Sequence, residues 1–123
     1  MEIVIQVNNQ FGTINAYDDR TAKTYTIEEL QNLASKGDEA AQKAMGDYFH
    51  EVKNPDEAMT WYKKAAENGN AKAQWHLGVR YFAGTDVEKD LDQSEYWFRK
   101  AAPQGHLDAT KMLKAFSPML NSN

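Results

Sequence analysis

The chain has 123 residues, of which 41% are hydrophobic and 26% are charged, and its formal net charge is −4. This length and composition fit one globular domain and exclude a largely disordered chain. The acidic balance argues against direct nucleic-acid binding, which needs a clustered cationic surface, and the absence of cysteine excludes disulfides, thiolate zinc sites and cysteine nucleophiles.

The N-terminal segment has the alternating polarity of a β-strand. Residues 2–7 follow this period-two pattern, residues 8–12 offer a turn, and short strands are expected around residues 14–16 and 24–26. The pattern predicts a β-hairpin or small meander over residues 1–26. Two roles are open for it: a lid on the helices that follow, or a strand edge that pairs with a partner's sheet.

Two kinds of targeting segment find no support in the sequence. The N-terminus lacks the basic start and the long apolar stretch of a secretory signal. No run approaches the ~18 apolar residues of a membrane span. We therefore expect a cytoplasmic protein without a membrane partner.

Helical spacing begins at residue 27. Thr26 followed by Glu29 predicts a capped helix start, and this first helix is expected to end near Gly37. Further along, Asn54 predicts another helix start, with a proline at the first helical position.

A sequence repeat organises the rest of the chain. The stretch from Trp61 to Gly69 recurs, with changes, from Trp97 to Gly105, and the glycines at 37, 69 and 105 are 32 and 36 residues apart. The first two of these glycines each precede a small, an apolar, a small and an aromatic residue at fixed offsets, and after the third the pattern begins again with Ala109 and Leu113. In the two full copies these residues are Ala41, Met45, Gly46 and Phe49, and Ala73, Leu77, Gly78 and Tyr81.

This pattern resembles the Sel1-like repeat family, relatives of the tetratricopeptide repeat with a longer loop between the paired helices. The resemblance implies a mainly α fold, namely a short α-α solenoid over residues 27–123 with about two repeats and terminal half-repeats. Three residues depart from the family pattern. Asp86 replaces a glycine, Ser94 replaces a packing alanine, and Pro103 is expected to end its helix early.

Catalytic and metal-binding patterns find little support. The three histidines form no HExxH motif and no pair three or four residues apart. Acidic residues alternate over residues 86–92 as in a calcium loop, but Leu91 stands where such a loop needs glycine and Trp97 where it needs glutamate. We expect no enzyme activity, no cofactor and no metal, which leaves a hydrolase as the least favoured hypothesis.

The resemblance to tetratricopeptide repeats implies that the first helix of each pair, the A helix, lines a concave binding groove. Trp75 is the expected anchor, because tryptophan is frequent in binding hot spots, although it is equally suited to packing between repeats. The full set of partner-binding candidates is Trp75, Val79, Phe82, Lys72, Lys43, Asp47 and His50.

The sequence favours a module that binds a protein partner, as an adaptor or scaffold. The alternative is a stand-alone inhibitor or immunity-type protein that blocks a microbial toxin or defence enzyme through an acidic surface. Six carboxylates are candidates for that surface: Asp38, Glu39, Asp47, Glu51, Asp56 and Glu57. A homodimer formed through the C-terminal helix is a further arrangement that the sequence leaves open.

Overall fold

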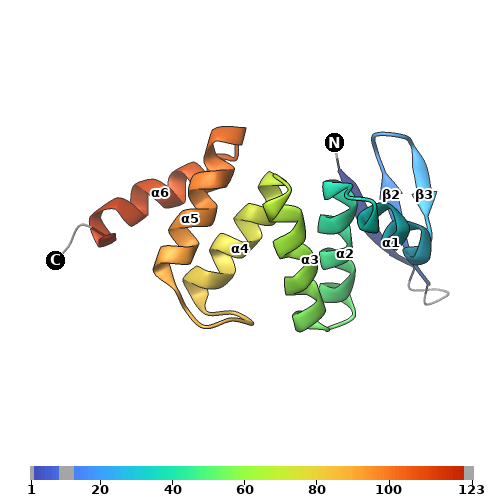
Figure 1. Cartoon of the computed structure of the whole chain (residues 1–123), viewed down its shortest axis with the longest axis horizontal. Helices are drawn as coiled ribbons and strands as arrows, with labels where there is room; N and C mark the ends of the chain where they lie inside the picture. The colour runs from blue at the N-terminus through green and yellow to red at the C-terminus, as the bar shows by residue number, and fades with distance from the viewer. Residues whose placement is uncertain (1, 9–12, 121–123) are drawn as a thin grey trace.

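The computed structural model describes residues 2–8 and 13–120, and it shows a row of helices that starts from a small sheet (Figure 1). The predicted mainly α class and N-terminal meander are confirmed. The strands are β1 (Ile3–Asn8), β2 (Thr13–Asp18) and β3 (Lys23–Tyr25). The helices are α1 (Ile27–Ser35), α2 (Glu39–Glu51), α3 (Pro55–Glu67), α4 (Ala71–Ala83), α5 (Leu91–Ala101) and α6 (Leu107–Leu120), with a 3₁₀ turn at Ala102–Gln104.

The sheet is an antiparallel meander in the order β1-β2-β3. Ile3 lies opposite Asp18, and Ala16 lies opposite both Ile5 and Tyr25. The third strand begins one residue earlier than the sequence suggested. Residues 9–12, which form most of the predicted turn, lie outside the described residues.

One face of the sheet covers the first helices. Ile3 and Ala16 are buried in one apolar cluster with Leu30 and Ala34 of α1 and with the alanines of α2. The sheet therefore acts as the predicted lid, since it covers an apolar helix surface that would otherwise meet water.

A buried carboxylate ties the lid to the helices. Asp18 is almost fully buried and accepts two hydrogen bonds from the Arg20 guanidinium, at 3.0 and 2.9 Å. The same guanidinium pairs with Asp38 at the start of α2, at 3.0 Å. The hydrogen bonds from Arg20 outweigh burial and hold the pKa of Asp18 below its ordinary value of 3.8.

This lowered pKa predicts an acid-sensitive contribution to stability. Ionised Asp18 stabilises the fold at pH values well above 3.8, and the contribution is lost as the pH falls through and below that value. Asp18→Asn is expected to lower the free energy of unfolding by about 1–2 kcal/mol at pH 7 and to flatten its decline between pH 5 and 3. Urea titrations over this range check it, with Glu88→Gln in the exposed α4–α5 loop as a control. If the free energy of unfolding of Asp18→Asn declines between pH 5 and 3 as steeply as that of the wild type, Asp18 is not the source of the acid sensitivity.

The helix starts follow the expected capping chemistry. Thr26 and Glu29 form a complete capping box at α1. The Asn54 side chain accepts from the backbone of Glu57 at α3, and Asn70 caps α4 in the same way. Each cap satisfies a backbone N–H that has no partner inside the helix.

The repeated glycines bring paired helices into close contact. A methyl group built on Gly46 would lie 2.6 Å from the Tyr62 ring, and one built on Gly78 would lie 2.4 Å from the Phe98 ring. In each pair the second helix, the B helix (α3 or α5), thus packs an aromatic side chain directly on the backbone of the A helix before it (α2 or α4). This contact occurs once in each repeat.

A ladder of side-chain amides joins successive repeats. The Gln42 amide nitrogen donates to the Ala34 carbonyl at 3.1 Å, and the Gln42 carbonyl accepts from the Asn68 amide at 2.8 Å. The next repeat contains the same two bonds, from Gln74 to the Ala66 carbonyl at 3.0 Å and from Gln104 to Gln74 at 2.8 Å. These bonds give the buried glutamines polar partners and place α1 in the position of a B helix.

The structure accommodates each of the three residues that depart from the family pattern. Asp86 adopts a positive φ of 62°, the conformation for which glycine is usual. The Ser94 hydroxyl donates to the Gly78 carbonyl at 2.6 Å. Pro103 lies in the 3₁₀ turn, and α5 ends at Ala101, two residues before the position where α3 ends.

The C-terminal helix continues past a proline. A proline commonly ends a helix, but α6 contains Pro118 and continues to Leu120. A proline near the end of a helix removes only one backbone hydrogen bond there. Phe116 is buried against Phe82 and Phe98, so this part of α6 caps the stack.

Candidate binding face on the A helices

The candidate site lies between consecutive A helices, which are α2, α4 and α6. Lys43, Asp47 and His50 of α2 are each 32 residues before Trp75, Val79 and Phe82 of α4. Lys43 and Asp47 lie toward the junction of α2 with α4. Trp75 and Phe82 lie toward the junction of α4 with α6. The two junctions differ in chemistry.

The α2–α4 junction is polar. Asp47 accepts a hydrogen bond from the Tyr62 hydroxyl at 2.6 Å and pairs with Lys43 at 2.6 Å. Burial, reinforced by the Asp47 carboxylate, raises the pKa of Tyr62, so the hydroxyl stays protonated and donates. The buried Tyr62 of α3 is thus held by Asp47 of α2 through its hydroxyl group.

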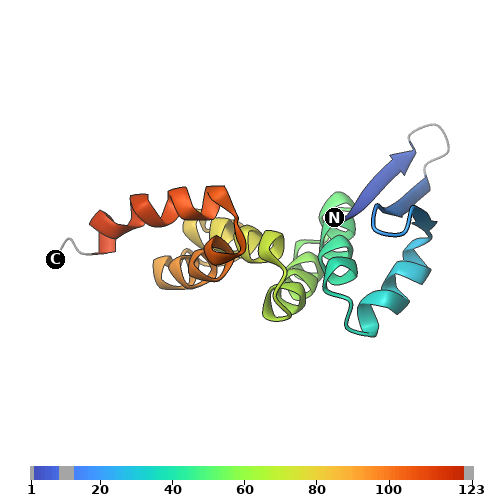
Figure 2. The same cartoon turned by 90° about the horizontal axis from the view of Figure 1, so that it is seen from above.

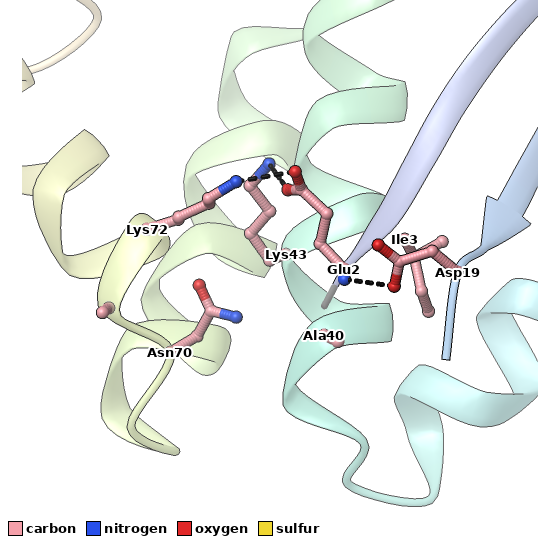
Figure 3. Close-up of a pocket in the computed structure, with 8 residues that line it drawn as sticks. Glu2, Ile3, Asp19, Ala40, Lys43, Asn70 and Lys72 are labelled. Carbon is pink, nitrogen blue, oxygen red and sulfur yellow. Dashed lines mark hydrogen bonds and ion pairs between the residues drawn. The ribbon is translucent and has the colours of Figure 1, made fainter. Parts of the chain in front are cut away.

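The residue that precedes β1 contributes a carboxylate to this junction. Glu2 pairs with Lys72 of α4 at 2.7 Å and lies 3.9 Å from the ammonium of Lys43 (Figure 3). The hydrogen bond from Lys72 holds the pKa of Glu2 below its ordinary value. These side chains line a cleft of about 230 Å³, together with Asn70. The sheet thus reaches past the first repeat and contacts the second.

Two further side chains surround Tyr62. His76 stacks on its ring with centroids 5.1 Å apart, and the Arg80 guanidinium lies 4.8 Å from the ring centroid. Arg80 is buried, and its Nε lies 3.9 Å from the Asp86 carboxylate without a hydrogen-bond partner. An aromatic face below a desolvated guanidinium stabilises that cation.

Burial lowers the pKa of His76 to about 4. The positive charges of Lys43 and Arg80 and a smaller effect of His50 act in the same direction, while Asp47 opposes them. His76 is therefore neutral in the folded protein at physiological pH. Its imidazole acts there as an uncharged stacking partner.

The neutral state of His76 predicts a second pH dependence. The unfolded chain takes up a proton near pH 6.5 and the folded protein only near pH 4, so stability is full above about pH 6.5 and falls as the pH drops toward 4. The loss is on the order of 1–2 kcal/mol. His76→Phe keeps a stacking ring that cannot be protonated, and it is expected to flatten this slope in denaturant titrations. His50→Gln, at an exposed position, is expected to keep the slope, and a wild-type slope in His76→Phe would contradict the prediction.

The α4–α6 junction is aromatic. Trp75 is half-buried, lies 5.1 Å from Phe98 and stacks on His106 at 5.0 Å. Phe82 packs edge-on against Phe116 at 5.5 Å. These rings thus contact one another across the α4–α6 junction.

The remaining candidates are accessible. Val79 is 36% exposed on α4. His50 is exposed and lines a second cleft of about 350 Å³ with Lys53, Pro55 and Asp86. The structure thus brings Lys43, Asp47 and Lys72 together, and it places His50, Val79 and the aromatic pair elsewhere on the A helices.

The proposed acidic surface is divided. Asp38 and Asp47 are paired with Arg20 and Lys43. The exposed carboxylates among the six candidates are Glu51, Asp56 and Glu57. Across residues 2–8 and 13–120, no cluster of three metal-ligating side chains occurs, and no helix in that part of the chain has the length and apolarity to cross a membrane.

Sequence reasoning missed Glu2, Tyr62, His76 and Arg80 as members of the junction. One signal was present for Tyr62: the equivalent position in the next repeat is phenylalanine, and a buried hydroxyl needs a partner. The contribution of Glu2 had no local signal, because its partners are 41 and 70 residues away.

The paired helices, the glycine–aromatic contacts and the amide ladder define a helical repeat protein. The Sel1 repeat family model matches residues 40–70 and 71–106, which is more than half of the chain. The chain therefore belongs to the Sel1 repeat family.

Solved structures with the same repeat agree closely. A Sel1 repeat protein from Oxalobacter formigenes superposes with a TM-score of 0.72 and 34% identity, over 76% of this chain and 73% of that one. A protective antigen of uropathogenic Escherichia coli superposes with a TM-score of 0.68 and 33% identity, over 78% of this chain and 21% of that one.

Curated relatives share shorter stretches. The secretory immunoglobulin A-binding protein EsiB of Escherichia coli O6:H1 is 56% identical over 39 residues, 32% of this chain and 8% of that protein. The Sel1-repeat-containing protein YjcO of Escherichia coli K12 is 40% identical over 60 residues, which are 49% of this chain and 24% of that protein. DAP3-binding cell death enhancer 1 of Rattus norvegicus is 30% identical over 87 residues, which are 69% of this chain and 17% of that protein. The chain thus spans less than a quarter of each of these relatives.

Proposed function

We propose that the chain is a non-catalytic binding module that holds a segment of a partner protein against its A helices. The observation that carries the proposal is the contrast between the two junctions. The α4–α6 junction is occupied by aromatic rings that pack against one another. The α2–α4 junction keeps an open cleft with charged side chains from three elements around it.

The chemistry of this face suits a peptide segment. Lys72 and Val79 lie about two turns apart on α4, and their side chains are accessible to a partner. A charged group next to an exposed apolar side chain offers the mixed contacts that are typical of protein interfaces. Trp75 and Phe82 belong to the proposal as the wall of the neighbouring aromatic junction.

The names of two relatives support this class of function. EsiB is named for binding secretory immunoglobulin A, and the rat relative is named for binding DAP3. Both match this chain over repeat sequence. We carry over only the kind of activity, which is recognition of a protein, and neither partner.

Partner capture with surface variants tests the proposal. Lys72→Glu and Val79→Arg are expected to weaken capture at least tenfold. The first reverses a charge on the face, and the second places a charge where the face is apolar. Lys63→Glu makes the same charge change at an exposed position of α3 and is expected to leave capture unchanged. Equal capture by all three variants would overturn the proposal.

Trp75 needs a separate measurement, because it also packs. A Trp75→Ala protein with normal circular dichroism and an unchanged dissociation constant would remove Trp75 from the binding face. A loss of about 2 kcal/mol or more of binding free energy is the result expected of a hot spot.

A further inference from the structure

The outer edge of strand β1 has the composition of a paired strand. The strand order places β1 at one side of the sheet, and among the described residues no strand pairs with its free edge. Its sequence, Ile-Val-Ile-Gln-Val-Asn, contains no charge, no proline and no glycine. Soluble proteins usually protect an exposed edge with lysine, proline or a bulge, and β1 has no such residue.

The ladder shows which backbone groups face the open edge. The Asp19 N–H donates to the Glu2 carbonyl at 3.2 Å, and the register of β1 and β2 places these two residues opposite each other. Hydrogen-bonded and non-hydrogen-bonded pairs alternate along an antiparallel ladder. The residues whose N–H and C=O groups point away from β2 are therefore Ile3, Ile5 and Val7.

On the face of β1 that packs on the helices, the side chains become more exposed along the strand. Ile3 is 1% exposed, Ile5 is half-buried, and Val7 on the same face is 41% exposed. Figure 2 shows the cause: the hairpin of β1 and β2 extends beyond the helices that cover its base. The same strand thus carries an exposed apolar side chain and three backbone positions that have no strand partner within residues 2–8 and 13–120.

We propose that β1 pairs antiparallel with β1 of a second copy of the chain, around a two-fold axis at Ile5. The two meanders then form one six-stranded sheet. Ile5 meets Ile5 of the second copy, and Val7 meets Ile3 of the second copy. All three are residues whose backbone groups face the open edge, so each can exchange hydrogen bonds.

This pairing is self-complementary in side chains as well as in backbone. The exposed Val7 comes to lie next to Ile3 of the second copy, which packs on α2, so the least covered position of one strand meets the best covered position of the other. No like charges oppose each other, because residues 3–8 are uncharged. An isologous contact of this kind closes on itself and gives a dimer.

Sedimentation equilibrium of the full chain tests the proposal. Between ~5 and ~500 µM the average mass is expected to rise from 14.0 kDa toward twice that value. Val7→Pro removes an N–H that faces the open edge and no bond to β2, and it is expected to weaken dimerisation at least tenfold. Val7→Thr keeps both the N–H and the branched side chain and is expected to dimerise like the wild type.

Amide hydrogen exchange checks the geometry and the fold of the variant. The amides of Ile5 and Val7 are expected to exchange more slowly at high concentration, while those of Val4 and Gln6 are slow at every concentration. Slow Val4 and Gln6 exchange in Val7→Pro shows that the hairpin is still formed. A chain that stays monomeric throughout, or a dimer that survives Val7→Pro and therefore forms elsewhere, such as on α6, would overturn the proposal.

Discussion

Replacing Phe98 with alanine is expected to lower the free energy of unfolding by about 3–5 kcal/mol. Phe98 is fully buried and touches two other helices, because its ring packs on Gly78 and Trp75 of α4 and on Phe116 of α6. Its removal leaves a cavity at the point where α4, α5 and α6 meet. The helices cannot close it without disturbing the contacts of Trp75 with His106 and of Phe116 with Phe82.

A matched control lies two residues away on the same helix. Tyr96 is 49% exposed, and Tyr96→Ala removes a larger side chain from a surface position. It is expected to cost less than 1 kcal/mol. Urea unfolding followed by circular dichroism compares the two variants, and similar losses in both would contradict the central position of Phe98.

Gly78→Ala is expected to lower the free energy of unfolding by about 2 kcal/mol, although alanine is the better helix former. The added methyl group would lie 2.4 Å from Cε1 of Phe98, so either the ring or the backbone of α4 must move. Gly46→Ala is expected to behave in the same way, because its methyl group would lie 2.6 Å from the Tyr62 ring.

Whether Gly78→Ala destabilises or stabilises the fold depends on the Phe98 ring. In a Phe98→Ala background the obstacle is gone, and Gly78→Ala is expected to increase stability by up to about 1 kcal/mol through helix propensity. A double-mutant cycle measures this reversal. If Gly78→Ala destabilises both backgrounds equally, close packing against Phe98 is not the reason for the glycine.

The helical repeat could be predicted because its determinants are local and periodic. Glycine stops, asparagine caps and the aromatic pair occur at fixed offsets, and each acts within a few residues of its own position. The strands of the lid were also predictable from alternation. The end of α6 could not be predicted. The low helix propensity of Pro118 does not show whether the last turn can form without the one backbone hydrogen bond that proline removes.

The candidate site could be predicted only in part. Lys43, Asp47 and Lys72 follow from the spacing of A helices. The ion pairs of Glu2 with α2 and α4 depend on how the meander sits on the helices, and no spacing within the repeat contains that information. The prediction for Trp75 remained divided because packing and binding require the same large aromatic side chain.

The amide ladder has a consequence for how the protein can vary. Its rungs on the A helices, Gln42 and Gln74, are 32 residues apart, whereas Asn68 and Gln104 at the ends of the B helices are 36 apart. The four additional residues lie in the loop between α4 and α5, and both rungs still form. Loop length is therefore uncoupled from helix register, so an insertion there changes the outline of the surface while the stack keeps its alignment.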